Sequence, residues 1–189
     1  MSEYSKQYQR LDQYISRLDR GRAYWVEALW IVIQSLLFSS FLPGSRWRVL
    51  LLRLFGARVG RGLVIKPGVR IKFPWRLSVG DHSWIGEDVW IDNLAQVSIG
   101  AHCCISQGAY LCTGSHDWRD PVFSLISQPI QIEDEVWVAA QATVAPGVHI
   151  GAGAVLGLGS VATSNLDEGW IYLGVPAQPV KQREIKNSL

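Results

Sequence analysis

A hydrophobic residue returns every six positions through most of this chain, and this period constrains the fold more than any other feature. Six fits neither an α-helix nor one alternating strand. It is typical of short strands joined by tight turns, with three strands in each coil of a β-solenoid. The clearest run is Ile132, Val138, Val144, Ile150, Leu156 and Ala162, and earlier runs are Val59, Ile65 and Ile71, then Val79, Ile85 and Ile91, then Ile99, Ile105 and Leu111.

This six-residue hydrophobic period, here called the beat, predicts an all-β solenoid over residues Arg58–Leu173. Two short insertions, near Phe73–Leu77 and Ala95–Ser98, fall at related places in successive coils, so we expect a stacked bulge at one corner. The 18 glycines suit tight corners, because glycine accepts positive φ without strain.

Charge and cysteine content exclude several classes of protein. The formal net charge is only +2, and the repeat has no run of Lys and Arg interleaved with aromatic residues, so nothing favours nucleic-acid binding. Cys103, Cys104 and Cys112 all lie in the repeat, where cysteine acts as a small apolar filler. Their odd number argues against a disulfide framework, and the polar first twenty residues hold no signal peptide. We therefore expect a cytoplasmic protein.

Residues 1–57 precede the repeat and are predicted to be an apolar helical region. Residues 23–42 carry one charge, Glu27, which shares a helical face with Gln34. Residues 46–57 predict a second, amphipathic helix. Three placements of the first helix remain open: against the solenoid end or another subunit, on a membrane face, or across a membrane. The basic residues that favour a membrane face are Arg17, Arg20, Arg22, Arg46 and Arg48.

The beat breaks between Leu111 and Ile132, which predicts a loop over 112–130 extruded from a corner. His116 stands at its root, and a neutral imidazole can take a proton from a hydroxyl group. His82 and His102 are expected to stack at another corner, and His149 lies at a turn on the surface. No third histidine falls in register with the stacked pair, so no metal site is expected.

Three segments of the chain together resemble the hexapeptide-repeat acyltransferases, and most closely the colanic acid biosynthesis acetyltransferases of bacterial exopolysaccharide clusters. They are CTGSHDWRDPVF, VWVAAQATVAPGVHIGAGAVLGLGSVAT and YLGVPAQPVK. The resemblance implies a left-handed parallel β-helix over 58–189, assembled as a homotrimer with active sites between neighbouring subunits. It also implies acetyl-CoA as the acyl donor, a sugar hydroxyl as the acceptor, and His116 as the general base, with Asp117 orienting either the loop or the imidazole.

The resemblance also implies where the two substrates bind. The coenzyme contacts it assigns are Trp137, Ala139, Ala140, Gly157, Leu158, Thr163 and, in the basic tail 174–189, Lys181 and Arg183. A backbone N–H of Ala139 or Ala140 would stabilise the developing oxyanion. Asp92, Asn93 and Trp118 are the candidate acceptor contacts. Gly86 replaces the asparagine of simple sugar acetyltransferases, so the acceptor is not expected to be a plain galactoside. Gln178 replaces a family Lys or Arg, so binding of the CoA phosphates is expected to depend more on Lys181.

Other functions fit parts of the pattern. An acetyltransferase for another small hydroxyl compound, such as an antibiotic or an amino acid, shares the repeat and the His116 loop. A metal-dependent hydratase would need a close histidine pair that the spacing of His82, His102 and His116 lacks. A non-catalytic trimeric scaffold would leave the His116–Asp117 loop unexplained. The apolar segment leaves peripheral contact with the inner face of the cytoplasmic membrane open.

Overall fold

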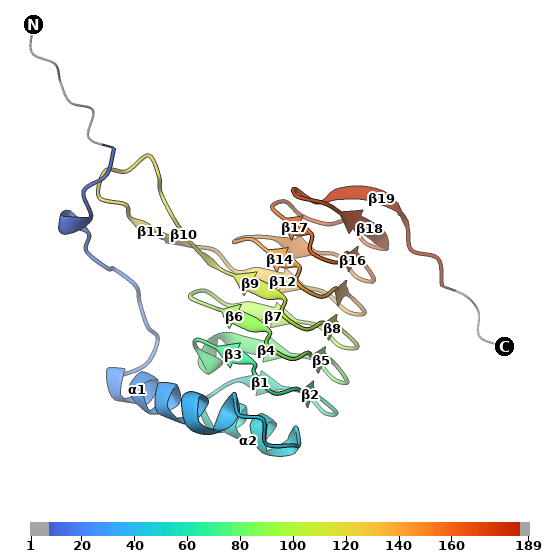
Figure 1. The fold of residues 1–189 in the computed structure, drawn as a ribbon, viewed down its shortest axis with the longest axis horizontal. Coiled ribbons are helices and arrows are strands. Elements are labelled where there is room, and N and C mark those ends of the chain that lie inside the picture. Colours follow the sequence, from blue (N-terminus) through green and yellow to red (C-terminus); the bar gives the residue numbers. More distant parts are fainter. Residues whose placement is uncertain (1–7, 186–189) are drawn as a thin grey trace, which may run out of the picture.

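The computed structural model describes residues 8–185. They form a parallel β-solenoid of about six turns with helices packed beneath its first turn (Figure 1). The solenoid predicted from the six-residue beat is thus confirmed. Its three walls are three sheets, here called A, B and C, in which each strand pairs with its equivalent one coil further along.

Each wall contains one strand from nearly every coil. Sheet A contains β1 (Arg58–Val59), β4 (Leu77–Val79), β7 (Val97–Ile99), β12 (Ile130–Ile132) and β15 (His149–Ile150). Sheet B contains β2 (Val64–Ile65), β5 (Trp84–Ile85), β8 (Cys104–Ile105), β13 (Trp137–Val138), β16 (Val155–Leu156), β18 (Trp170–Leu173) and β19 (Gln178–Gln182). Sheet C contains β3 (Arg70–Ile71), β6 (Trp90–Asp92), β9 (Tyr110–Cys112), β14 (Thr143–Val144) and β17 (Val161–Ala162).

The residues of the beat form buried ladders inside the solenoid. In sheet B, Ile65 pairs with Ile85, which pairs with Ile105, and each is at most 1% exposed. Because like side chains stack in register, every coil has the same cross-section. The residues that repeat every six positions therefore form a continuous, straight core. The predicted stack of His82 on His102 is also present, with ring centroids 5.4 Å apart.

Glycine at the corners is required by the close approach of neighbouring coils. A Cβ added at Gly80 would lie 2.5 Å from the backbone nitrogen of Ala101, and one added at Gly100 would lie 2.4 Å from Asp134 Oδ1. Both distances are far below van der Waals contact, so these corners exclude larger residues without a shift of the next coil.

The helices are shorter than the predicted ranges. The described N-terminal part begins with a 3-10 turn, η1 (Leu11–Gln13), and α1 covers Tyr24–Ile33 before a π-helical turn, η2 (Gln34–Phe38). After a turn, α2 covers Arg46–Leu54, and a further 3-10 turn, η3 (Pro74–Arg76), lies at the predicted bulge.

One face of α1 caps the open edge of the first coil. Trp30 Nε1 donates to Ile71 O at 2.7 Å, and Gln34 Oε1 accepts from Ile71 N at 2.6 Å. Trp30 and Phe38 are fully buried in the same hydrophobic core as the solenoid. Packing against the solenoid end, the first of the three placements, is therefore the one found for the inner face of α1. Such capping also protects an edge that would otherwise present unpaired backbone groups.

Two other expectations for the N-terminal region change. Within residues 8–185, no helix combines the length and the hydropathy that a membrane crossing requires. Among the arginines counted as membrane-facing, Arg48 is fully buried, Arg20 binds Glu27, and Arg17 lines a cavity near the extruded segment. Sequence spacing could not separate these cases, because each depends on which neighbour the helix packs against.

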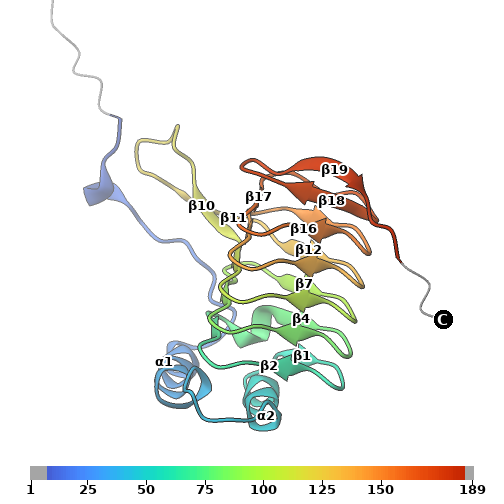
Figure 2. The same cartoon turned by 45° about the vertical axis from the view of Figure 1, so that its right-hand side comes forward.

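The predicted C-terminal tail is partly ordered into the solenoid. β19 pairs antiparallel with β18, with Lys181 opposite Ile171 (Figure 2). The last four residues of the predicted tail lie outside the described residues. The three cysteines are free thiols, and burial raises the pKa of Cys103 above its usual value.

Candidate active site

The extruded segment is a β-hairpin rather than a plain loop. β10 (Gly114–His116) pairs antiparallel with β11 (Leu125–Ser127), with His116 opposite Leu125. The hairpin leaves the solenoid after β9 in sheet C and returns at β12 in sheet A, so it projects from the flank away from sheet B (Figure 1). β12 begins at Ile130, and its Ile132 pairs with Ile99 and Ile150, so the beat resumes at Ile132 as the sequence predicted.

The hairpin fixes the orientation of the His116 imidazole. Nδ1 lies 2.7 Å from the backbone carbonyl oxygen of Phe123. Because a carbonyl only accepts hydrogen bonds, Nδ1 carries the proton and Nε2 of the neutral ring has its lone pair available. The Phe123 ring stacks on the imidazole at a centroid distance of 4.1 Å, and Tyr14 meets it edge-on at 5.8 Å. No motif or spacing in the sequence indicated Tyr14 or Phe123 as site residues, because both reach His116 only through contacts made in the folded chain.

Backbone geometry around Phe123 aims its carbonyl at His116. Phe123 has φ of 56°, in the left-handed region that side chains rarely occupy. The Phe123 N–H donates to Asp120 O at 2.8 Å, and the Val122 N–H donates to Asp120 Oδ1 at 3.0 Å. A hydrogen bond from Ser124 lowers the pKa of the Asp120 carboxyl, which keeps the carboxylate that accepts from Val122 ionised.

Asp117 organises the hairpin loop and does not bond the imidazole. Its Oδ1 accepts from the Arg119 N–H at 3.0 Å and from Arg119 Nε at 3.2 Å. These bonds hold the pKa of the Asp117 carboxyl below its usual value, the backbone N–H being the larger cause. Of the two roles open for Asp117, the structure therefore favours capping the loop.

A groove on sheet B brings together six of the eight predicted coenzyme residues. It encloses about 760 Å³, and its walls are the coil corners after β8, β13 and β16 together with the C-terminal segment. The six predicted residues that line it are Trp137, Ala139, Ala140, Gly157, Leu158 and Arg183. Ser106, Gln107 and Ile185 also line it, and the resemblance did not indicate them.

The remaining predicted coenzyme residues lie outside this groove. Thr163 is exposed just after β17, and Lys181 is exposed on β19. Arg183 lines the groove, but its Nη1 already donates to the carbonyls of Glu135 and Gly153 at 2.8 and 2.9 Å. Gly157 is needed for packing as well, because a Cβ there would lie 2.0 Å from Leu173 Cδ2.

The two candidate oxyanion donors differ in their hydrogen bonding. The Ala139 N–H donates to Leu156 O at 2.8 Å as part of the coil-to-coil ladder. The Ala140 N–H has no partner among residues 8–185 and borders the groove. Ala140 is thus the one of the two whose N–H remains available to a bound oxyanion.

Asp92 lies in a different cavity from His116. That cavity, of about 260 Å³, is lined by residues of α1 and sheet C that include Glu27, Gln34 and Lys72. Asp92 Oδ1 pairs with Lys72 Nζ at 3.5 Å, and the Tyr110 hydroxyl donates to Asp92 Oδ2 at 3.3 Å. Burial raises the pKa of Tyr110 well above its usual value, so the phenol stays protonated.

Asn93 holds the stacked bulge together from inside. It is 0% exposed, and its side-chain oxygen accepts from the Phe73 N–H at 2.9 Å. Its amide nitrogen donates to Phe73 O at 2.7 Å and to Arg76 O at 3.0 Å. With its donors and acceptor used by the backbone, Asn93 has nothing to offer a sugar. The sequence-based assignment of Asn93 to the acceptor fails because an asparagine at a corner can point inward as readily as outward.

Replacing Asn93 by alanine is therefore expected to lower stability rather than acceptor affinity. The change leaves the Phe73 N–H and two carbonyls without partners, at a cost of about 2–4 kcal/mol. Urea unfolding measures this cost, and the acceptor KM of the folded variant should equal that of the wild type. A raised KM with unchanged unfolding would return Asn93 to the acceptor site.

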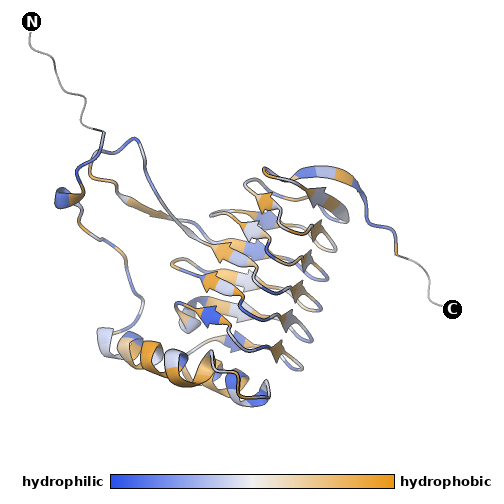
Figure 3. Ribbon diagram, viewed as in Figure 1, coloured by the Kyte–Doolittle hydropathy of each residue, from blue (hydrophilic) through white to orange (hydrophobic). Residues whose placement is uncertain are grey.

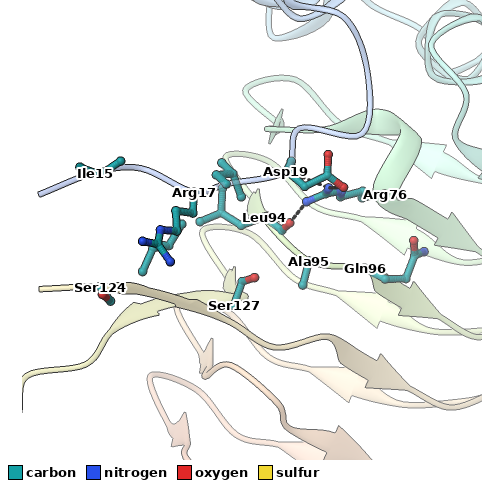
Figure 4. A pocket seen from close by; sticks show the side chains of 11 residues that line it. Ile15, Arg17, Asp19, Arg76, Leu94, Ala95, Gln96, Ser124 and Ser127 are labelled. Carbon is teal, nitrogen blue, oxygen red and sulfur yellow. Dashed lines mark hydrogen bonds and ion pairs between the residues drawn. The ribbon is translucent and has the colours of Figure 1, made fainter. Parts of the chain in front are cut away.

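A cavity beside the hairpin is lined by Leu125, the cross-strand partner of His116. It encloses about 480 Å³ between the N-terminal segment, the corner at Leu94–Gln96 and β11 (Figure 4). Ile15, which follows Tyr14, also lines it. Arg76 binds Asp19 at the other end of the cavity. Trp118 lies outside, 80% exposed on the hairpin.

Within residues 8–185, no group of three or more His, Cys, Asp or Glu side chains is arranged to hold a metal ion. No family model matches the chain. Individual relatives do match it, and the chain belongs to the hexapeptide-repeat acetyltransferases.

The chain is 44% identical over 156 residues to a protein of Escherichia coli K12, covering 82% of this chain and 86% of that protein. That relative bears the provisional name colanic acid biosynthesis acetyltransferase WcaF. A Vibrio cholerae hexapeptide-repeat acetyltransferase, solved with acetyl coenzyme A, is 25% identical with a TM-score of 0.77, covering 85% of this chain and 88% of that one. A Clostridium difficile maltose O-acetyltransferase shares the fold, with 22% identity and a TM-score of 0.76 over 86% of this chain and 90% of that one.

Proposed function

We propose that this protein transfers the acetyl group of acetyl-CoA to a sugar hydroxyl in exopolysaccharide synthesis. The observation that carries the proposal is the 2.7 Å contact between His116 Nδ1 and Phe123 O, which leaves Nε2 as a base. Support also comes from the groove on sheet B and from the WcaF-like relative and the Vibrio structure with acetyl coenzyme A. A cytoplasmic location suits a reaction that consumes acetyl-CoA.

In the proposed reaction, Nε2 of His116 removes the proton of the sugar hydroxyl as its oxygen attacks the thioester carbonyl. The new C–O bond forms, and the carbonyl oxygen gains a negative charge that the Ala140 N–H would stabilise. Collapse of this intermediate breaks the C–S bond. The leaving thiolate then takes the proton that His116 holds, so the enzyme returns to its starting state. No covalent acyl-enzyme is needed, because the thioester is already activated.

Within one chain, the base and the groove belong to different walls of the solenoid. His116 lies on the hairpin between sheets C and A, whereas the groove lies on sheet B (Figure 1). We therefore propose a homotrimer in which the hairpin of one protomer reaches the groove of the next. In this arrangement Trp118, exposed on the hairpin, is placed to contact the acceptor or the neighbour. The cavity beside β11 would hold the sugar.

Mixed trimers test this arrangement directly. His116→Ala removes the base, and Ala140→Tyr fills the groove, so each variant alone should be inactive. When the two are coexpressed with different tags and purified through both, sites that combine an intact hairpin with an intact groove should restore activity. In a cyclic trimer that contains both variants, one site in three combines an intact hairpin with an intact groove, so activity should return to about a third of that of the wild type.

Two results would contradict a site formed by the hairpin of one protomer and the groove of the next. If the mixed sample stays as inactive as the separate variants, the base and the groove belong to the same chain. If size-exclusion chromatography with light scattering shows a monomer that is fully active, no neighbour is needed. Calorimetry of CoA binding provides the control, because His116→Ala should still bind CoA and Ala140→Tyr should not.

A further inference from the structure

The helices below the first coil present an exposed apolar surface on the side that faces away from the solenoid. We call it the base surface. Its members lie on α1, on η2, on the turn after η2 and on α2, and their large side chains are all exposed. They are Trp25, Leu29, Val32, Leu36, Phe41, Leu42, Leu50 and Leu54.

The pattern of side chains along α1 and η2 separates the face of the base surface from the face that packs against the solenoid. Glu27, Trp30, Gln34 and Phe38 face the solenoid, where they are buried or bonded. Trp25, Leu29, Val32 and Leu36 also recur at spacings of four, three and four, which puts them on one stripe of the opposite face. Trp25 is 70% exposed and Leu36 is 71% exposed. Figure 3 shows the first helix as largely apolar and the second as a mixture of apolar and polar residues.

α2 continues this surface. Val49 and Leu52 pack inward with Arg48, whereas Leu50 and Leu54, one turn apart, point outward. In Figure 2 the two helices lie side by side as a layer below β1 and β2. An apolar area of this extent on a water-soluble protein marks an interaction surface.

The charges around the base surface are almost all positive. Residues 20–58 contain six arginines, no lysine and one acid. That acid, Glu27, is neutralised by two hydrogen bonds from Arg20 at 2.6 and 2.5 Å. Arg22 and Arg46 are exposed at the beginnings of α1 and α2 and have no acidic partner among residues 8–185. The rim of the base surface is therefore cationic.

We infer that the base surface binds the face of an anionic lipid bilayer. A cationic rim around an apolar stripe, with tryptophan at one end, is the chemistry of a helix that lies in the plane of a membrane interface. α1 and η2 are too short to cross the bilayer, which agrees with an in-plane position. A second copy is a poor occupant, because a self-complementary contact here would bring the same arginines face to face.

The inference goes beyond the proposed function and does not depend on it. The hairpin and the groove lie on the flanks of the coils, whereas the base surface lies at their end, so a trimer built through the flanks leaves it open. If the threefold axis runs along the solenoids, three base surfaces would face the same membrane and strengthen one another.

Sedimentation with sucrose-loaded vesicles tests the inference on the full-length protein. Vesicles of phosphatidylcholine with phosphatidylglycerol, at about 3:1, should bind the wild type at least about tenfold more tightly than phosphatidylcholine alone. Leu36→Glu should reduce this binding to the level of the neutral vesicles. Val180→Glu, the same change at an exposed position of β19, should bind as the wild type does. Arg46→Gln should weaken binding to the anionic vesicles only, and added salt should do the same.

Two controls keep the result interpretable. Circular dichroism should show that Leu36→Glu is folded, since its side chain is mostly exposed, and its acetyl transfer to a soluble acceptor should be unchanged. Equal vesicle binding by the wild type and Leu36→Glu would overturn the inference, as would a wild type that binds neither vesicle. A concentration-dependent assembly that Leu36→Glu abolishes would place another copy of the chain on the base surface instead.

Discussion

His116→Ala is expected to reduce kcat for acetyl transfer by about 10²–10⁴-fold, the usual contribution of a positioned general base. The loss follows from the hydrogen bond between Nδ1 and Phe123 O, which prepares Nε2 for the acceptor hydroxyl. Removing the ring leaves the sugar hydroxyl to lose its proton to water. A thiol-release assay with saturating acetyl-CoA measures the effect, and the KM for acetyl-CoA should change little because the groove is untouched.

A matched histidine variant separates catalysis from general damage. His82 is exposed at a corner far from the hairpin, and its positive φ of 56° suits asparagine. His82→Asn should therefore keep full activity. Normal turnover by folded His116→Ala would rule out the proposed base, and an equal loss in His82→Asn would show that the assay reports folding.

Arg48→Leu is expected to destabilise the protein by about 2–4 kcal/mol, because four backbone carbonyls lose a charged hydrogen-bond donor. Arg48 is fully buried, and its guanidinium donates to the carbonyls of Phe38, Ser40, Leu42 and Gly44 at 2.5–2.9 Å. Those four carbonyls form the turn between η2 and α2. Without the guanidinium they lose their partners, and the base of the solenoid loses the contact that fixes this turn.

The size of the effect depends on the planar fork of the arginine side chain. Arg48→Lys keeps a charge but cannot reach four carbonyls at once, so about half of the loss should remain. Arg46→Leu, two residues earlier and exposed, should change stability by less than about 0.5 kcal/mol. Urea unfolding of the three variants measures the order of their free energies of unfolding. An Arg48→Leu variant as stable as Arg46→Leu would show that water can hydrogen-bond the four carbonyls of the turn in place of the guanidinium. Burial lowers the pKa of Arg48, but an arginine stays charged across the working range.

The groove on sheet B shows which of the predicted site residues the fold brings together. Six of the eight candidates that the resemblance gave line one cavity. Five of them belong to or follow β13 and β16, which stack in register in sheet B, and the sixth, Arg183, follows β19. Thr163 lies elsewhere because it follows β17, which is in register but belongs to sheet C. Lys181 lies elsewhere because β19 pairs antiparallel with β18 after the repeat has ended. The same limit applies to Tyr14, which meets His116 from a segment with no repeat at all.

The polar residues at the corners were the least predictable. Asn93 and Asp92 are adjacent in sequence, yet Asn93 is enclosed by backbone groups of the bulge while Asp92 pairs with Lys72 beside α1. Arg48 and Arg46 differ in the same way, one buried under the turn and the other exposed. A polar side chain can satisfy its hydrogen bonds with backbone or with solvent, and composition does not distinguish the two outcomes.

The sequence by itself determined the solenoid, because a six-residue period has one regular solution in which every apolar residue meets its equivalent in the next coil. It also located the interruption that carries His116. Only the tertiary structure decided which nitrogen of His116 is free, since that depends on a carbonyl seven residues away across the hairpin. It alone decided which face of α1 packs and which is left for a partner, because the hydropathy of the segment is high on both sides and only contact with the first coil separates them.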